Sequence, residues 1–135
     1  MRSRVYTLEL KTREQTQFLD ITSEVRKLVA ESGVTEGTCF VYVPHTTAGI
    51  TINENADPTV VADMLMEINK LIPFDDNYRH SEGNSAAHIK ASLFGANVLV
   101  FITGGKLQLG TWQGIYFCEF DGPRQRKVLV KIVQD

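Results

Sequence analysis

Short apolar runs recur along the chain, and polar segments rich in glycine and proline separate them. Four of these runs are CFVYV, VLVFIT, IYFCEF and VLVKIV. Each has the length of one buried strand, and turn-forming residues separate the runs. Helical patterns do not alternate regularly with these strands, so a doubly wound parallel sheet or a TIM barrel is not expected.

Seven strands are predicted in all. Val5–Leu10 alternates between apolar and polar positions, with Tyr6, Leu8 and Leu10 on one face. We expect this strand to form a hairpin with the next one through the polar segment KTREQTQ. The predicted strands cover residues 5–10, 18–21, 38–44, 50–53, 98–103, 115–120 and 128–133.

Two to three helices are predicted between the strands. Thr22 has the character of an N-cap, and Gly33 that of a helix end. The longest helix is expected to begin at Asp57-Pro58, where the carboxylate caps free N–H groups and proline has no N–H to lose. A short helix is expected over residues 86–94. The apolar stripe of the longest helix should face the core and consists of Val60, Val61, Met64, Leu65, Ile68 and Leu71.

The 135 residues fit a single domain, residues 1–135. The net charge of −2 supplies no basic field to hold nucleic acid, and no apolar stretch approaches the roughly 18 residues of a membrane span. No long apolar run follows the basic start, so we expect no signal peptide and a soluble, cytoplasmic protein. Cys39 and Cys118 lie in apolar runs and are expected to be buried free thiols.

All three histidines fall in turn-rich polar segments, where binding groups are usually carried. His45 follows the strand CFVYV, and Thr46, Thr47 and Gly49 add hydroxyls and a flexible backbone that suit a phosphate or another anion. A tight turn with a hydrogen-bonded histidine is the structural alternative.

Four of the five residues at positions 53–57, just before the longest expected helix, have polar side chains. Capping that helix needs only one or two of them. These side chains are Asn53, Glu54, Asn55 and Asp57, and the carboxylates among them could bind Mg²⁺ through oxygen or accept hydrogen bonds from a substrate. The free N–H groups at the helix start equally favour an anion.

His80 and His88 are eight residues apart, and Gly83 argues against one helix through both. With His80 in a loop and His88 on a helix, the two imidazoles could converge on zinc or another divalent ion. Alternatively, one histidine moves a proton, since the imidazole pKa lies near neutrality. The residues alone leave both roles open.

A second glycine-rich region follows the strand at residues 98–103. Lys106 and the turn residue Arg124 could pair with a phosphate, and Trp112 could stack on a heteroaromatic ring. The structural alternatives are a tryptophan in the core, glycines that form hairpins, and a solvated charge in the turn.

Four motifs, in this order, resemble the YjbQ-like family, often described as secondary thiamine-phosphate synthase enzymes. They are HTTAGITINENADP, HSEGNSAAHIK, LGTWQGI and E-x-D-G-P-R, and the resemblance runs from about Val5 to the carboxyl end. It implies an α+β fold, a β-sandwich-like arrangement of about seven strands with two to three helices, and a homotrimer.

The resemblance also implies a function. The family is credited with a weak ability to join a pyrimidine pyrophosphate to a thiazole phosphate, so we expect a transferase with a small phosphorylated substrate. The alternative is a trimeric protein that binds a metal or a phosphometabolite without this turnover. From motifs and chemistry together, the expected catalytic residues are His45, Glu54 and His88. The expected substrate-binding residues are Thr46, Thr47, Asn53, Asn84, Trp112 and Arg124. The expected ligands of a divalent ion, Mg²⁺ or Zn²⁺, are His45, His80, His88 and Asp57.

Overall fold

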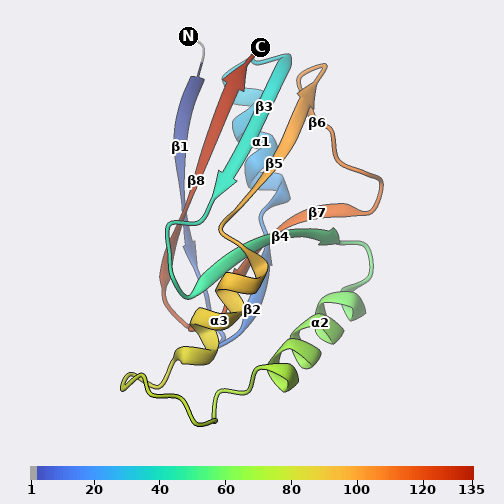
Figure 1. Ribbon diagram of the computed structural model, residues 1–135. Coiled ribbons are helices and arrows are strands. Elements are labelled where there is room, and N and C mark those ends of the chain that lie inside the picture. Colours follow the sequence, from blue (N-terminus) through green and yellow to red (C-terminus); the bar gives the residue numbers. More distant parts are fainter. Residues whose placement is uncertain (1–2) are drawn as a thin grey trace.

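The computed structural model describes residues 3–135 as three helices and eight strands in two antiparallel sheets (Figure 1). The predicted α+β class is confirmed, with one short strand more than predicted. The strands are β1 (Ser3–Lys11), β2 (Gln17–Asp20), β3 (Glu36–Tyr42), β4 (Ala48–Glu54), β5 (Asn97–Thr103), β6 (Lys106–Leu107), β7 (Gln113–Glu119) and β8 (Gln125–Gln134). The helices are α1 (Thr22–Ser32), α2 (Pro58–Leu71) and α3 (Ser85–Phe94).

The larger sheet has the strand order β1-β8-β3-β5-β6, with antiparallel neighbours throughout. Among the described residues, one face of this sheet is packed against the rest of the chain and the other is exposed. In β3, Cys39 and Val41 lie in the core, whereas Phe40 and Tyr42 are exposed on the opposite face. This is the alternation that a strand imposes on successive side chains. Tyr6, Leu8 and Leu10 share one face of β1, as the alternation predicted, and this face packs partly buried against the core.

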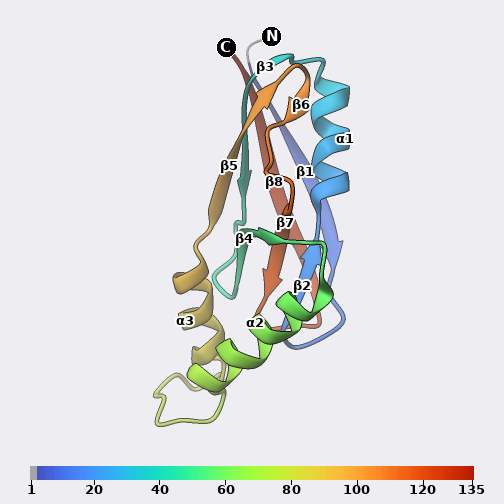
Figure 2. The same cartoon turned by 90° about the vertical axis from the view of Figure 1, so that its right-hand side faces the viewer.

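The smaller sheet has the order β2-β7-β4 and packs on the buried face of the larger one. Ile50 of β4 and Phe117 of β7 share one core cluster with Val41 and Val130 of the larger sheet. Figure 2 shows the smaller sheet beside the lower half of the long strands. The two layers therefore give the sandwich-like arrangement that was expected.

The predicted hairpin between the first two strands is wrong. β1 pairs with β8 in the larger sheet, whereas β2 pairs with β7 in the smaller one. The polar segment between β1 and β2 therefore carries the chain from one sheet to the other. Adjacency in sequence predicts a hairpin, but the apolar face that each strand must bury decides its partner.

α1 covers the upper part of the core and buries Val25 and Val29 (Figure 2). Gly33 ends this helix in the left-handed conformation, with a φ of 71°, as predicted. Thr22, the predicted N-cap, is already inside the helix. Its hydroxyl donates to a carboxylate oxygen of Asp20 and accepts from the backbone N–H of Ile115. The hydroxyl thus ties α1 to β7 and does not cap the helix.

α2 begins as predicted, with Asp57 capping the N–H of Thr59 and Pro58 in the first turn. Its predicted burial in the core is wrong, because α2 has no buried residue and Leu71 is 67% exposed. Three side chains of the stripe pack partly against a small second cluster at the end of the molecule that also carries α3, namely Val61, Met64 and Leu65. Periodicity shows which face of a helix is apolar, but not how much of it one chain covers.

Cys39 and Cys118 are buried free thiols, as predicted. Burial raises the pKa of Cys39 to about 12 and that of Cys118 well above its ordinary value, so both stay protonated. None of the helices within residues 3–135 has both the length and the apolar character to cross a membrane.

Candidate functional site

The loop after β3 and the helix α3 face a common cavity of about 540 Å³. His45 and Thr46 line it from the loop, and His88 and Ser92 line it from α3. Gly49 allows this approach, because a Cβ there would lie 2.9 Å from the carbonyl oxygen of Gly95 at the end of α3. The structure thus brings together two histidines that are 43 positions apart in the sequence.

A second cavity, of about 470 Å³, adjoins the first at His88, which lines both. His80, Arg79 and Ser85 contribute to its wall. The rings of His80 and His88 meet edge to face with their centroids 5.7 Å apart, and Nε2 of His80 lies 3.8 Å from a carboxylate oxygen of Glu82. The three predicted histidines therefore line two adjoining cavities at one end of the molecule.

A backbone hydrogen bond determines which tautomer His45 adopts when neutral. Nε2 of His45 accepts from the N–H of Lys127 at 2.9 Å, so the ring proton is on Nδ1. Partial burial lowers the pKa of His45 below its ordinary value, and the positive charge of Arg126 lowers it further. His45 is therefore a neutral imidazole at neutral pH, and its Nδ1 proton has no hydrogen-bond acceptor within residues 3–135.

A buried ion pair lies beneath the histidine loop. The guanidinium of Arg126 binds both carboxylate oxygens of Glu119, and its Nη2 also donates to the hydroxyl of Thr47 at 2.9 Å. Thr12 donates to the same carboxylate at 2.8 Å, and so does the N–H of Asp121 at 3.0 Å. Burial alone would raise the pKa of Glu119, but these hydrogen bonds outweigh it and hold the pKa below its ordinary value.

Thr47 is thus mainly structural, because it is buried and its side chain contacts Arg126. Glu119 and Arg126 were not among the site residues predicted from the sequence. Both lie at inward-facing positions of strands, where a charged residue needs a partner. A charged residue at a buried position of an otherwise apolar strand was the signal that could have identified each of them.

Asn84 and Arg124 meet at the carboxylate of Asp121. Arg124 binds it at 3.0 Å and also donates to the carbonyl oxygen of Asp121, and Asn84 donates to the same carboxylate at 2.8 Å. The amide oxygen of Asn84 is buried and has no hydrogen-bond partner within the described part of the chain. Because Arg124 remains about half exposed, it can still contact a bound anion.

The remaining predicted residues lie at the other end of β4. Ala48 begins this strand beside the histidine cavity and Glu54 ends it, a span of about 20 Å at 3.3 Å per residue. Trp112 lies at the Glu54 end, where its carbonyl oxygen accepts from the N–H of Asn55. Its side chain is 61% exposed and does not lie in the core. Within one chain, the predicted site residues therefore form two separate groups. One is the histidine group, and the second contains Asn53, Glu54, Asp57 and Trp112.

The predicted metal ligands do not converge within one chain. Asp57 lies in the second group and uses its carboxylate to cap α2. Across residues 3–135, no three side chains of the His, Cys, Asp or Glu type are arranged to hold a metal ion. His80 contacts both His88 and Glu82, as described above, but this set is not arranged as a metal site.

Lys90, within the motif HSEGNSAAHIK, is a buried cation that was not among the predicted site residues. Its ammonium donates to the amide oxygen of Asn69 at 2.6 Å and lies 4.2 Å from the centre of the Phe74 ring. Burial lowers its pKa to about 8. Asn69 belongs to α2 and Lys90 to α3, so this contact fastens the weakly packed α2 to the helix that carries His88.

Comparison with known proteins identifies the family. Residues 6–135 match the family model described as UPF0047 protein YjbQ-like. The chain is 52% identical to the UPF0047 protein YugU of Bacillus subtilis, over 94% of this chain and 97% of that protein. It is 50% identical to a UPF0047 protein of Methanocaldococcus jannaschii, over 97% and 95% of the two chains.

Solved structures agree with this assignment. The crystal structure of a YjbQ/UPF0047-family protein from Clostridium acetobutylicum is similar with a TM-score of 0.93 and 59% identity, over 95% of this chain and 99% of that one. A hypothetical protein from Aeropyrum pernix is similar with a TM-score of 0.93 and 34% identity, over 98% and 99% of the chains. The resemblance read from the four motifs is thus confirmed, and the chain belongs to the YjbQ-like UPF0047 family.

Proposed function

We propose that the protein is an enzyme acting on a small phosphorylated substrate bound in the cavity between His45 and His88. The observation that carries this proposal is that the two imidazoles line one cavity. In addition, His45 is held neutral, and its Nδ1 proton has no acceptor within residues 3–135. A pair of imidazoles at one cavity is suited to general acid–base chemistry near neutral pH. The half-exposed guanidinium of Arg124 and the hydroxyl of Thr46 are the proposed contacts to phosphate.

The specific reaction that we propose is thiamine-phosphate synthesis. The nitrogen of a thiazole phosphate attacks the methylene carbon of a pyrimidine pyrophosphate, and the new C–N bond forms as the C–O bond breaks. Pyrophosphate leaves with the electron pair of that bond. Groups that neutralise the departing charge lower the barrier, and a hydrogen bond from His45 or His88 to the leaving oxygen would contribute.

The test is an assay of thiamine phosphate formation with both substrates. His45→Ala and His88→Ala should each lower kcat/KM by about 10²- to 10⁴-fold, the usual range for loss of a general acid or base. Leu93→Ala is a matched control, because Leu93 lies on α3 but its side chain is exposed and does not line the cavity. Wild-type turnover in both histidine variants would overturn the proposed site.

We further propose that the protein works as a homotrimer. The support is the outer face of the larger sheet, which no part of residues 3–135 covers. The register pairs Phe40 with Leu99 and Thr38 with Phe101, so the exposed apolar side chains are neighbours. A patch of this kind is typical of a subunit interface. Its apolar members, here called the outer patch, are Val5, Phe40, Tyr42, Leu99 and Phe101.

Assembly would also explain why the predicted site is divided. In one chain, Glu54 lies about 20 Å along β4 from Ala48, which lines the histidine cavity, and Trp112 lies at the Glu54 end of that strand. We propose that a neighbouring subunit brings its own Glu54 and Trp112 to the histidine cavities, where the indole would stack on the pyrimidine. Glu54→Ala should then lower turnover as strongly as His88→Ala does. A mixed trimer of the two variants would regain some activity, because some of its cavities combine intact groups from different subunits.

A second candidate function is the binding of a metal ion or a phosphometabolite without turnover. The observation that favours it is the close approach of His80, His88 and Glu82. Neutral imidazoles with a carboxylate are typical zinc ligands. Elemental analysis of protein purified without chelators separates this candidate from the enzyme, because a stoichiometric metal without synthase activity would favour binding alone.

A further inference from the structure

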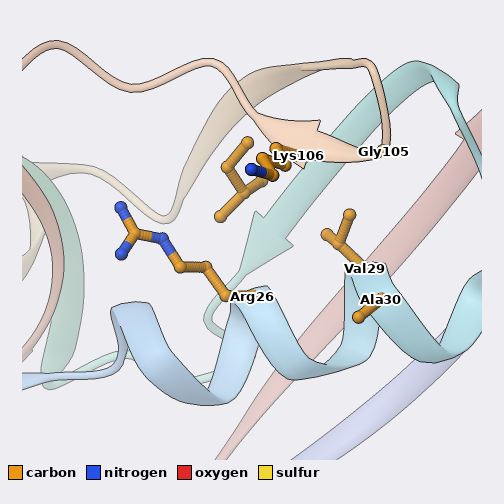
Figure 3. Close-up of a pocket in the computed structure, with 6 residues that line it drawn as sticks. Arg26, Val29, Ala30, Gly105 and Lys106 are labelled. Carbon is orange, nitrogen blue, oxygen red and sulfur yellow. The ribbon is translucent and has the colours of Figure 1, made fainter.

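A cavity of about 390 Å³ opens between α1 and the hairpin of β5 and β6, far from the histidines (Figure 3). Its floor is the main core itself, since Val29 and Leu107 belong to the core cluster. Ala30 of α1 and Gly105 of the hairpin form part of the rim. This volume lies within the range of about 300–1,000 Å³ that is usual for sites of small molecules.

The hairpin wall of this cavity is held in place by its own hydrogen bonds. Gly104 and Gly105 both have positive φ values, 58° and 78°, which a tight two-residue turn requires. The N–H of Gly105 donates to the carbonyl oxygen of Thr35 at 2.9 Å, and the N–H of Gly104 donates to the carboxylate of Glu36. These bonds fasten the turn to the segment that follows α1. The cavity is therefore a formed feature of the fold, because both of its walls are fixed.

Two cations share this apolar cavity. Arg26 lines the cavity from α1, and Lys106 lines it from the hairpin of β5 and β6 (Figure 3). Neither side chain takes part in any ion pair or side-chain hydrogen bond within residues 3–135, although the chain carries a net charge of −2. Two like charges beside one apolar surface repel each other, and a bound anion would relieve this repulsion.

We propose that this cavity binds a small amphiphilic anion. The apolar body of the ligand lies on Val29, Ala30 and Leu107, and its charged head lies between Arg26 and Lys106. A carboxylate or a phosphate monoester fits this chemistry equally, because both accept hydrogen bonds from a guanidinium and an ammonium. Since α1 covers the buried face of the larger sheet, the cavity stays open when the outer patch is covered by other subunits.

Octanoate, octyl phosphate and the neutral isostere octanamide are the probes, and backbone amide NMR of the intact protein follows their binding. Octanoate or octyl phosphate should give saturable shifts at Ala30, Gly105 and Lys106, and the tighter of the two identifies the head group. Octanamide should bind about tenfold more weakly than the anions, equivalent to about 1.4 kcal/mol. Equal binding of octanamide and octanoate, or no saturable shift with either anion, would overturn the proposal.

Variants separate the charge from the cavity. Arg26→Met and Lys106→Met keep the stems and remove the charges, and each should weaken octanoate binding about two- to fivefold, as expected for an exposed ion pair. Ala30→Trp should fill the cavity and abolish binding without changing the charge. Lys27→Met is the matched control, because Lys27 is exposed on α1 but does not line the cavity. An equal loss in the control would show that only the overall charge matters and would refute the site.

Discussion

The carboxylate of Glu119 and the guanidinium of Arg126 form a fully buried ion pair directly beneath the loop that carries His45. The pair joins the two sheets, because Glu119 belongs to β7 in the smaller sheet and Arg126 to β8 in the larger one. Nη2 of Arg126 also donates to the hydroxyl and the carbonyl oxygen of Thr47, two residues after His45. The position of the histidine loop therefore depends on the contact between the sheets.

Glu119→Ala should lower the free energy of unfolding by about 3–5 kcal/mol, because it leaves the Arg126 charge buried without a partner. The double variant Glu119→Leu with Arg126→Met should recover part of this loss, since no buried charge remains. Chemical denaturation of the two variants and the wild type measures both effects. If the double variant were less stable than Glu119→Ala, the unpaired charge would not be the cause.

Protein stability should depend on the titration of His45. Its pKa is lower in the folded chain than the ordinary value of about 6.5, so folding favours the neutral ring. The stabilisation is fully present above that ordinary value and is lost as the pH falls through the folded pKa. Calorimetry between pH 7.5 and 5, the window around that value, should therefore show a smaller loss of Tm in His45→Gln than in the wild type. Parallel curves would contradict the assignment.

Lys90 should make the protein more stable as the solution becomes alkaline. Its pKa is about 8 in the folded chain, against 10.5 for the ordinary side chain, so the folded state favours the neutral amine. Stability should rise as the pH increases from about 8 to 10.5, and Lys90→Met should not show this rise. Lys70→Met, an exposed change on α2, is the control and should keep the wild-type dependence. Denaturant midpoints at several pH values measure the difference.

Charges placed on the outer patch should break the proposed trimer. Phe40→Asp with Phe101→Glu would put two carboxylates into a dry interface, where each costs several kcal/mol. Sedimentation velocity should then give a monomer, whereas Lys27→Glu on the far side of the larger sheet should leave the trimer intact. A wild-type protein that is monomeric at all concentrations would disprove the assembly.

The metal-binding candidate predicts that the metal content of the protein depends on the His80 and His88 pair. If a divalent ion binds there, His80→Ala should lower the metal content of the purified protein, because an imidazole ligand is lost. Asp57→Asn should leave the content unchanged, since Asp57 lies in the second group, at the far end of β4. Mass spectrometry of metals in the two variants gives the readout, and equal losses in both would contradict the His80 position.

Local patterns predicted the elements well where the signal was local. The runs CFVYV and VLVFIT formed strands, Asp57-Pro58 began a helix and Gly33 ended one, because alternation, capping and left-handed backbone depend on neighbouring residues. The four motifs also identified the family correctly. These local patterns do not predict which distant strands pair with each other. For that reason the predicted hairpin of β1 and β2 was wrong.

The functional residues show the same division. The sequence by itself determined that three histidines lie in polar segments, since polarity and turn residues are read locally. Only the tertiary structure decided that His45 and His88 share a cavity, that Glu54 and Trp112 lie at the other end of β4, and that the apolar stripe of α2 is hardly covered. The physical reason is that these relations depend on how two sheets pack against each other, and that packing is specified by apolar faces far apart in the chain.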